Sequence, residues 1–252
     1  MEKKYKNILK LALNSNCIRQ DRTKVGCLSL FNQNLSISLN NYFPILTSRY
    51  ISQKIFETEF LWFLNGETNI NRFKKNNIKI WNNWANKNGE LGPVYGYQML
   101  NYNNSNINQL NNVINSLKNN KDSRRHIINL WNPEQLNEMA LPPCYLYFQF
   151  FVENHKLNMF VVQRSGDLFL GIPYDVCLFS MFLLYIAEKT NLKANKINIQ
   201  IVDAHIYKNQ IDAVKEYLEQ PIFAMPKYIY KNKKLTLKNY QYSKKITAKV
   251  AI

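Results

Sequence analysis

Residues 163–175 read QRSGDLFLGIPYD. Residues 157–164 are rich in β-formers and lead into this stretch, and the apolar residues 174–192 follow it. The stretch therefore predicts a strand joined to a long helix that is buried on most sides. It also combines a cation, a hydroxyl, two glycines, a proline and two carboxylates. These groups favour an anion-binding cradle, so we expect the fold and the chemistry of the chain to meet here.

The rest of the chain predicts an α+β fold, in which helices cover a mostly β core. Residues rich in β-formers predict strands of one sheet, and apolar residues at helical spacing predict helices. Further strands are expected at 26–46 (with turns), 125–131, 145–153 and 197–203. Helices are expected at 1–15, at 51–65 and in the second half of 101–120, after an asparagine-rich surface loop. No repeat or Pro/Gly/Ser-rich linker interrupts residues 1–252, which we interpret as one domain.

Composition indicates a compact globular protein with an acidic partner. Hydrophobic residues make up 46% of the 252 residues, and Lys and Arg (33) outnumber Asp and Glu (17), for a net charge of +16. This charge suits nucleic acid, a membrane surface or phosphorylated small molecules. The codon bias of an AT-rich genome explains the spread-out lysines equally well. The chain has no RRM-type motif, zinc-finger spacing or leucine-zipper repeat, so no nucleic-acid partner is expected.

The four cysteines include one candidate nucleophile. They are Cys17, Cys27, Cys144 and Cys177, without CxxC spacing. Met1 is followed by charged residues, and no apolar run is long enough to span a bilayer. We therefore predict a cytoplasmic protein with reduced thiols and no membrane partner. No bound metal is predicted either. Cys144 follows two prolines that make the entry to a strand rigid, which makes it a candidate nucleophile, although a lone cysteine is more often a small buried hydrophobe. The other three are interpreted as structural.

Several arginines could hold a phosphate. Arg124 and Arg125 are adjacent, and adjacent guanidiniums repel each other unless an anion or solvent separates them, so a phosphate clamp and a solvated turn are both open. Arg164 and Ser165 add a third cation and a hydroxyl. An arginine close to Cys144 is expected to lower the thiol pKa.

Other polar and aromatic residues could serve a reaction on a flat ring. Glu59 interrupts an apolar helix stripe, so it either enters the core as a proton-transfer group or faces solvent. Trp81 and Trp84, with the segment 92–96 that contains Tyr95, form either an aromatic platform or ordinary core. His205 and Tyr207 alternate at a strand end and could bind sugar hydroxyls.

Taken together, these motifs resemble the thymidylate synthase family along essentially the whole chain. The matching segments are 21–23, 59–64, 81–85, 91–96, 122–125, 143–144, 163–165 and 203–207, and residues 248–252 resemble the closing C-terminal tail of the family. The resemblance implies a homodimer whose sheets pack back to back. It implies a pyrimidine nucleoside monophosphate as substrate and 5,10-methylenetetrahydrofolate as one-carbon donor.

The resemblance also assigns roles to residues. Phosphate, base and sugar would be bound by Arg22, Gln163, Arg164, Ser165, Asp175, His205 and Tyr207 of one subunit and by Arg124 and Arg125 of the other. The folate would meet Arg49, Trp81, Trp84, Asp167, Gly171 and Ala251. The Cys144 thiolate would add to C6 of the pyrimidine, and C5 would then attack the folate methylene carbon. Glu59 would move protons through water, within a catalytic group that includes Tyr95, Tyr145 and Asp175.

Two residues depart from the family pattern. Asp175 stands where thymidylate synthases carry asparagine, and Tyr145 replaces a histidine near the C4 edge of the base. A carboxyl group suits the amino group and bare N3 of cytosine, and phage deoxycytidylate hydroxymethylases have aspartate here. The sequence therefore predicts (d)CMP hydroxymethylation in a phage or an AT-rich bacterium. Tyr145 also makes a direct transfer of the family's proton relay doubtful.

Three alternatives stay open. A closed tail would exclude water and favour methylation of dCMP to 5-methyl-dCMP. Asp175 could be neutral or turned away, so that uridylate is still accepted. Orthodox conversion of dUMP to dTMP is then the activity. A non-catalytic, RNA-binding homologue is the alternative from another class.

Overall fold

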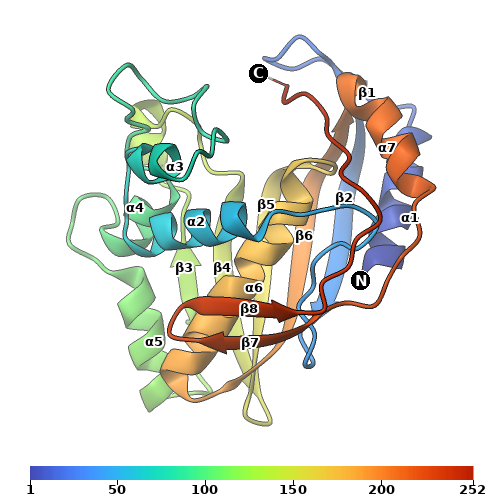
Figure 1. Cartoon of the computed structure of the whole chain (residues 1–252). Helices are drawn as coiled ribbons and strands as arrows, with labels where there is room; N and C mark the ends of the chain where they lie inside the picture. The colour runs from blue at the N-terminus through green and yellow to red at the C-terminus, as the bar shows by residue number, and fades with distance from the viewer. Residues whose placement is uncertain (252) are drawn as a thin grey trace.

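The protein is built on one six-stranded mixed sheet, seen here in a computed structural model that describes residues 1–251. The strand order is β1-β2-β6-β5-β4-β3 (Figure 1). The strands are β1 (Ile18–Arg19), β2 (Cys27–Ser38), β3 (Ile127–Asn129), β4 (Tyr145–Glu153), β5 (Lys156–Asp167) and β6 (Lys193–Tyr207). Neighbours pair antiparallel except β5 and β6, which pair parallel and need a crossover between them. This architecture confirms the predicted α+β class.

The crossover is helix α6, the most buried helix of the described chain. It spans Gly171–Thr190 and packs against α2 (Gln53–Leu64), where the rings of Phe60 and Phe182 meet edge to face at 5.2 Å. A parallel pair requires such a connection, and an apolar helix fits because the sheet and its neighbouring helices cover most of it. By length and hydropathy α6 could also cross a membrane, but 72% of its apolar window is buried inside this fold, as in a core helix.

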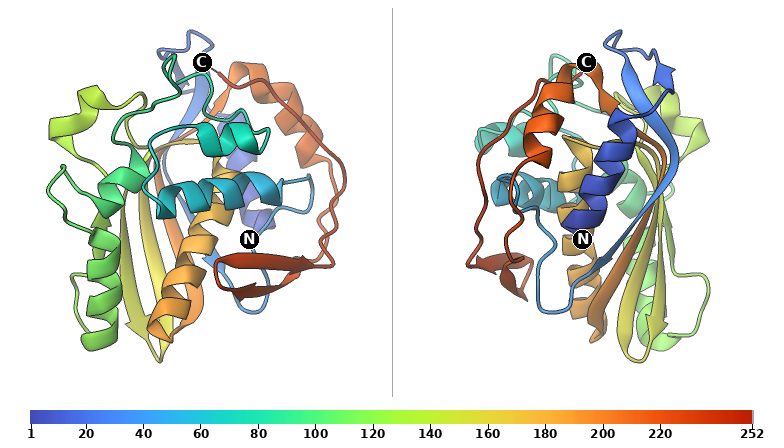
Figure 2. Two further views of the ribbon diagram at one scale, coloured as in Figure 1. Left: turned by 60° about the vertical axis from the view of Figure 1, so that its left-hand side comes forward. Right: turned by 90° about the vertical axis from the view of Figure 1, so that its right-hand side faces the viewer.

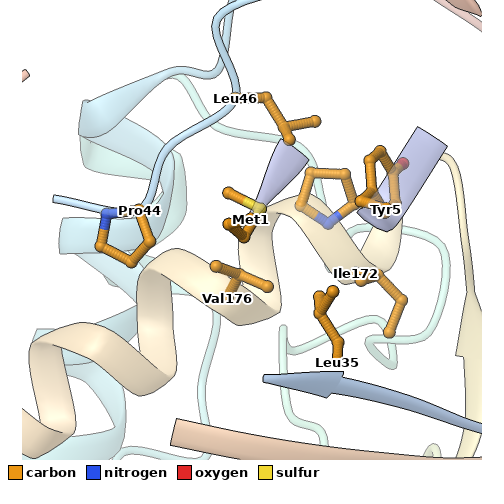
Figure 3. A pocket seen from close by; sticks show the side chains of 8 residues that line it. Met1, Tyr5, Leu35, Pro44, Leu46, Ile172 and Val176 are labelled. Carbon is orange, nitrogen blue, oxygen red and sulfur yellow. The ribbon is translucent and has the colours of Figure 1, made fainter. Parts of the chain in front are cut away.

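The other helices lie on the same side of the sheet as α6 or at its end. Figure 2 (right) shows α1, α2 and α6 together on one side of the strands. The helices are α1 (Glu2–Leu13), α3 (Asn71–Lys75), α4 (Tyr95–Leu100), α5 (Gln109–Asn119) and α7 (Ile211–Leu218). Where α1 meets β2 and α6, side chains such as Tyr5, Leu35 and Ile172 line an apolar crevice (Figure 3). The crevice has no room for a water molecule, so it is part of the packed core and not a ligand site.

The opposite face of the sheet carries exposed apolar side chains. Phe31 on β2 is 83% exposed and Phe151 on β4 is 62% exposed, and Ile127 on β3 is also open. Side chains of this size are normally buried, so their exposure on one sheet face makes this face a candidate for a protein–protein contact. This face is relevant to the predicted homodimer.

Element boundaries differ from the predictions in instructive ways. The region 26–46 holds one continuous strand, β2, followed by irregular chain. β5 continues to Asp167 and α6 begins at Gly171, three residues before the predicted start, so most of the 163–175 stretch is regular structure. β6 also extends beyond 203, which places His205 and Tyr207 inside it. A hairpin, β7 (Lys227–Lys231) with β8 (Lys234–Lys238), was not predicted, because its lysine-rich strands carry only short apolar alternations.

Candidate active site

The candidate nucleophile lies where an irregular segment enters β4. The backbone N–H of Cys144 donates to the hydroxyl of Tyr95 at 2.9 Å, and its carbonyl accepts from the N–H of Arg164 at 2.7 Å. The Arg164 guanidinium donates to the carbonyls of Pro142 and Pro143 at 2.9 and 2.8 Å. Because the prolines have no N–H of their own, these side-chain bonds are what hold the segment. The thiol is thereby fixed between α4 and β5.

The thiol itself is less acidic than the sequence suggested. Burial raises the pKa of Cys144, whereas the positive charge of Arg164 lowers it and the carboxyl of Asp175 raises it further. Smaller effects of the Tyr95 hydroxyl and of Arg22 lower it. Arg164 thus lowers the thiol pKa as predicted, but desolvation outweighs it, so the pKa of Cys144 stays above its ordinary value.

Glu59 enters the core rather than facing solvent. It is 9% exposed on α2, and the indole N–H of Trp81 donates to its Oε1 at 3.0 Å. Burial, reinforced by the nearby carboxyl of Asp175, raises its pKa to about 8. A carboxyl that titrates near neutral pH can both give and take a proton, as the predicted proton-transfer role requires.

Aromatic residues surround Glu59 and Cys144, with Trp81 bonded to Glu59 and Tyr95 bonded to Cys144. Trp81 lies 5.9 Å from both Trp84 and Tyr95, and Tyr95 lies 4.7 Å from Tyr145. Trp81 is only 7% exposed, so it packs in the core while its indole N–H contacts Glu59. The indole N–H of Trp84 is buried without a partner among residues 1–251, which leaves a donor for a ligand.

Tyr145, in place of the family's histidine, is a buried neutral hydroxyl. It is 4% exposed and meets the ring of Phe179 edge to face at 5.0 Å. Burial, followed by the proximity of Tyr95 and Glu59, raises its pKa well above the ordinary value. Tyr145 therefore keeps its proton near neutral pH, and it cannot take up a second proton as an imidazole can.

Asp175 lies near the start of α6, against β5. The side-chain N–H of Gln163 donates to its Oδ2 at 2.7 Å, while Oε1 of Gln163 is buried without a partner in the described chain. Burial raises the pKa of Asp175 to about 7, although the Gln163 bond works in the opposite direction. Asp175 can therefore be either neutral or ionised at neutral pH, and it lies close enough to Glu59 and Cys144 to raise their pKa values.

The predicted phosphate ligands fall into two groups. Arg164 and Ser165 lie on β5, and Arg22 is exposed on the turn before β2, close enough to lower the thiol pKa of Cys144. Arg124 and Arg125 are also exposed, and Arg124 borders a hollow on the open sheet face with Phe151 and Phe160. Arg22, Arg164 and Ser165 thus come together within one chain. Arg124 instead lies on the sheet face that carries exposed apolar residues.

The predicted sugar ligands form a small network on β6. The ring of His205 lies 4.9 Å from that of Tyr207, and its Nδ1 lies 3.5 Å from the carboxylate of Asp203. Burial by itself would lower the pKa of His205, but the hydrogen bond and charge of Asp203 raise it overall. Arg19 pairs with the other carboxylate oxygen at 2.6 Å. Sequence reasoning missed Arg19, because only β-pairing brings it to β6.

Two of the predicted folate ligands, Asp167 and Arg49, bond to other residues of the chain. Asp167 accepts from the N–H groups of Phe169 and Leu170 at 2.9 Å and from the Gln210 side chain at 2.8 Å. Arg49 is 3% exposed, with its guanidinium 4.2 Å from the ring of Phe169 and donating to that residue's carbonyl. Gly171 begins α6, and Ala251 is 5% exposed in the tail. Their folate contacts stay predictions.

An α+β fold with a cysteine at a strand entrance, a buried glutamate and a strand-borne arginine defines a nucleophilic transferase site. The thymidylate synthase family model matches residues 3–252. A thymidylate synthase of Wigglesworthia glossinidia brevipalpis is 40% identical over 244 residues, which cover 96% of this chain and 92% of that protein. The chain belongs to the thymidylate synthase family of one-carbon transferases, and thymidylate synthases bind a pyrimidine monophosphate and a folate.

The prediction of cytidylate hydroxymethylation is wrong. The 40% identity to a thymidylate synthase, over nearly the full length of both chains, supports the methylation of dUMP instead. The prediction assumed that Asp175 would present only acceptors to a uracil. Burial raises its pKa to about 7, so a neutral carboxyl group is available. A neutral carboxyl carries one donor and one acceptor, as does the asparagine that it replaces.

Proposed function

We propose that this chain methylates dUMP at C5 to form dTMP, with 5,10-methylenetetrahydrofolate as the one-carbon donor. The observation that carries the proposal is that Asp175, which can carry a proton, lies close to both Cys144 and Glu59 in a chain 40% identical to a thymidylate synthase. The nucleophile, the proton carrier and the base-reading group are then all within one chain.

The residues around the base have distinct tasks. Cys144 loses its proton and its sulfur forms a bond to C6 of the uracil, which makes C5 nucleophilic. Arg164 favours the thiolate electrostatically, and Tyr95 fixes the backbone of the nucleophile. Glu59, with a pKa of about 8, removes and returns protons at the base through water. Tyr145 closes the aromatic side of the pocket and helps to exclude water.

The pocket also suits a folate. When bound, the folate supplies a one-carbon unit and a hydride. The free indole N–H of Trp84 offers a buried donor, and the exposed part of its ring offers a flat apolar surface. Asp167, Gly171 and the tail at Ala251 would complete the site, and Arg49 would turn from Phe169 toward the folate tail.

The proposal is tested by incubating the purified chain with dUMP and 5,10-methylenetetrahydrofolate. We expect a near-ultraviolet absorbance rise from dihydrofolate and a product that is heavier than dUMP by one methylene unit in mass spectrometry. Parallel reactions contain dCMP or CMP, or lack the folate. Turnover of dCMP without turnover of dUMP, or a hydroxymethylated product, would contradict the proposal.

We further propose that the chain acts in the cytoplasm as a homodimer joined through the open face of its sheet. Phe31 and Phe151 are exposed there, and Arg124 borders a hollow on the same face, where it could reach the phosphate site of a partner subunit. Sedimentation velocity is expected to give a dimer for the native chain and a monomer for Phe151→Asp, because a buried unpaired carboxylate is costly. Leu11→Asp, at an exposed position on α1, is the control. A native monomer would refute this interface.

A further inference from the structure

The Gln163–Asp175 pair has an unusual hydrogen-bond inventory. Gln163 is 1% exposed on β5, and its amide N–H makes a 2.7 Å bond to Oδ2 of Asp175. The amide oxygen has no partner among residues 1–251. Oδ2 of Asp175 therefore acts as an acceptor for this N–H. When the carboxyl group is neutral, its proton is better placed on the other oxygen, Oδ1.

Placement of that proton decides which pyrimidine the carboxyl group can bind. Uracil presents a donor at N3 and an acceptor at O4, whereas cytosine presents an acceptor at N3 and a donor at C4. A neutral carboxyl group has an acceptor on one oxygen and a donor on the other. In a fixed orientation it can therefore pair with either uracil or cytosine, but not with both. An ionised carboxylate, with acceptors on both oxygens, opposes O4 of uracil.

We propose that Gln163 and Asp175 act as one recognition unit for uracil, in which the Gln163 amide keeps the proton of a neutral Asp175 on Oδ1. Oδ2 then accepts from N3–H and the Oδ1 hydroxyl donates to O4. Asp175 contacts the base, and Gln163 is a positioning residue that acts through it. This inference rests on the proposed function, because it takes dUMP as the substrate. If the inference holds, dUMP binds only when Asp175 is protonated. An asparagine at position 175 would bind dUMP without this proton.

The surroundings of Asp175 favour the neutral acid. No cation contacts it in the described chain, since Arg164 instead donates to the carbonyls of Pro142 and Pro143. Burial raises its pKa to about 7, and every titratable group that couples to it is acidic. These groups are Glu59 on α2, Tyr95 on α4, Cys144 just before β4, Tyr145 on β4, Asp167 on β5 and Cys177 on α6.

The first test compares the native chain with Asp175→Asn, whose amide has the same donor and acceptor without a titrating proton. Isothermal titration of dUMP in buffers of different ionisation enthalpy measures proton uptake on binding. At pH 8 we expect the native chain to take up close to one more proton than the variant. Its dUMP affinity, relative to the variant, should fall about tenfold per pH unit above pH 7. Protonation of the nucleotide phosphate is common to both proteins and cancels. Equal proton uptake and parallel pH profiles would overturn the inference, whereas no dUMP binding by either protein would instead refute the proposed function.

The second test removes the Gln163 amide while keeping the side-chain length. In Gln163→Met, the preference for dUMP over dCMP in kcat/KM at pH 6.5 should fall about tenfold, roughly the effect of one lost hydrogen bond. The same change in an Asp175→Asn background should alter the preference much less, because an amide needs no help to place its donor. A purely structural role for Gln163 would reduce both nucleotides equally in both backgrounds, and that result would contradict the inference.

Discussion

Replacing Cys144 with serine is expected to lower kcat for dUMP methylation by about 10⁴-fold or more, the order of loss seen when a covalent nucleophile is removed. A serine hydroxyl is far harder to ionise, and the pocket already penalises an ionised group here, since burial raises even the thiol pKa. Affinity for dUMP should change little, because Arg164 and the other phosphate ligands remain. Activity under initial-rate conditions and dUMP titration measure the two effects separately.

Cys17 provides the matched control for this prediction. It is exposed at the surface, so Cys17→Ser should keep native activity. A covalent adduct with a dUMP analogue that carries fluorine at C5 should be detected by denaturing mass spectrometry in the native chain and in Cys17→Ser. The adduct should be absent from Cys144→Ser. An adduct that maps to Cys27 or Cys177 would disprove the assignment of the nucleophile.

Replacing Glu59 with glutamine is expected to lower kcat by about 10² to 10⁴-fold, the usual contribution of a positioned acid or base. The amide fills the same space and can accept from Trp81, so dUMP binding should survive. Glu57 lies on the same helix, partly exposed and bonded to Gln53, and Glu57→Gln should leave kcat unchanged. Full activity in Glu59→Gln would remove Glu59 from the mechanism.

The same variant separates catalysis from stability. The pKa of Glu59 is raised to about 8 in the folded chain, above its ordinary value of 4.5. Its contribution to stability is therefore full below pH 4.5 and is lost as pH rises through 8. Above that pH the native chain carries a buried carboxylate that Glu59→Gln does not. Denaturant unfolding at pH 9 should show the variant to be the more stable protein, even though it is less active.

Local patterns predicted many elements and several parts of the site. The apolar periodicity of residues 51–65 identified α2, and Pro142-Pro143 ahead of Cys144 indicated the rigid strand entrance that the structure confirms. The same periodicity left Glu59 between core and solvent, because its environment depends on Trp81, 22 residues away. The β7–β8 hairpin and the extra length of β6 were missed, since pairing partners rather than local composition extend a strand.

The amino-acid sequence by itself determined the class of chemistry, because the family motifs identify a one-carbon transferase of the thymidylate synthase family. Only the tertiary structure decided the charge states. Burial raises the thiol pKa of Cys144 against the pull of Arg164, and it raises the pKa of Asp175 to about 7 beside an amide 12 residues earlier in the chain. The type of residue determines which side-chain group can lose a proton. The free energy of losing it depends on desolvation and neighbouring charges, and those exist only once β4, β5, α2 and α6 have packed together.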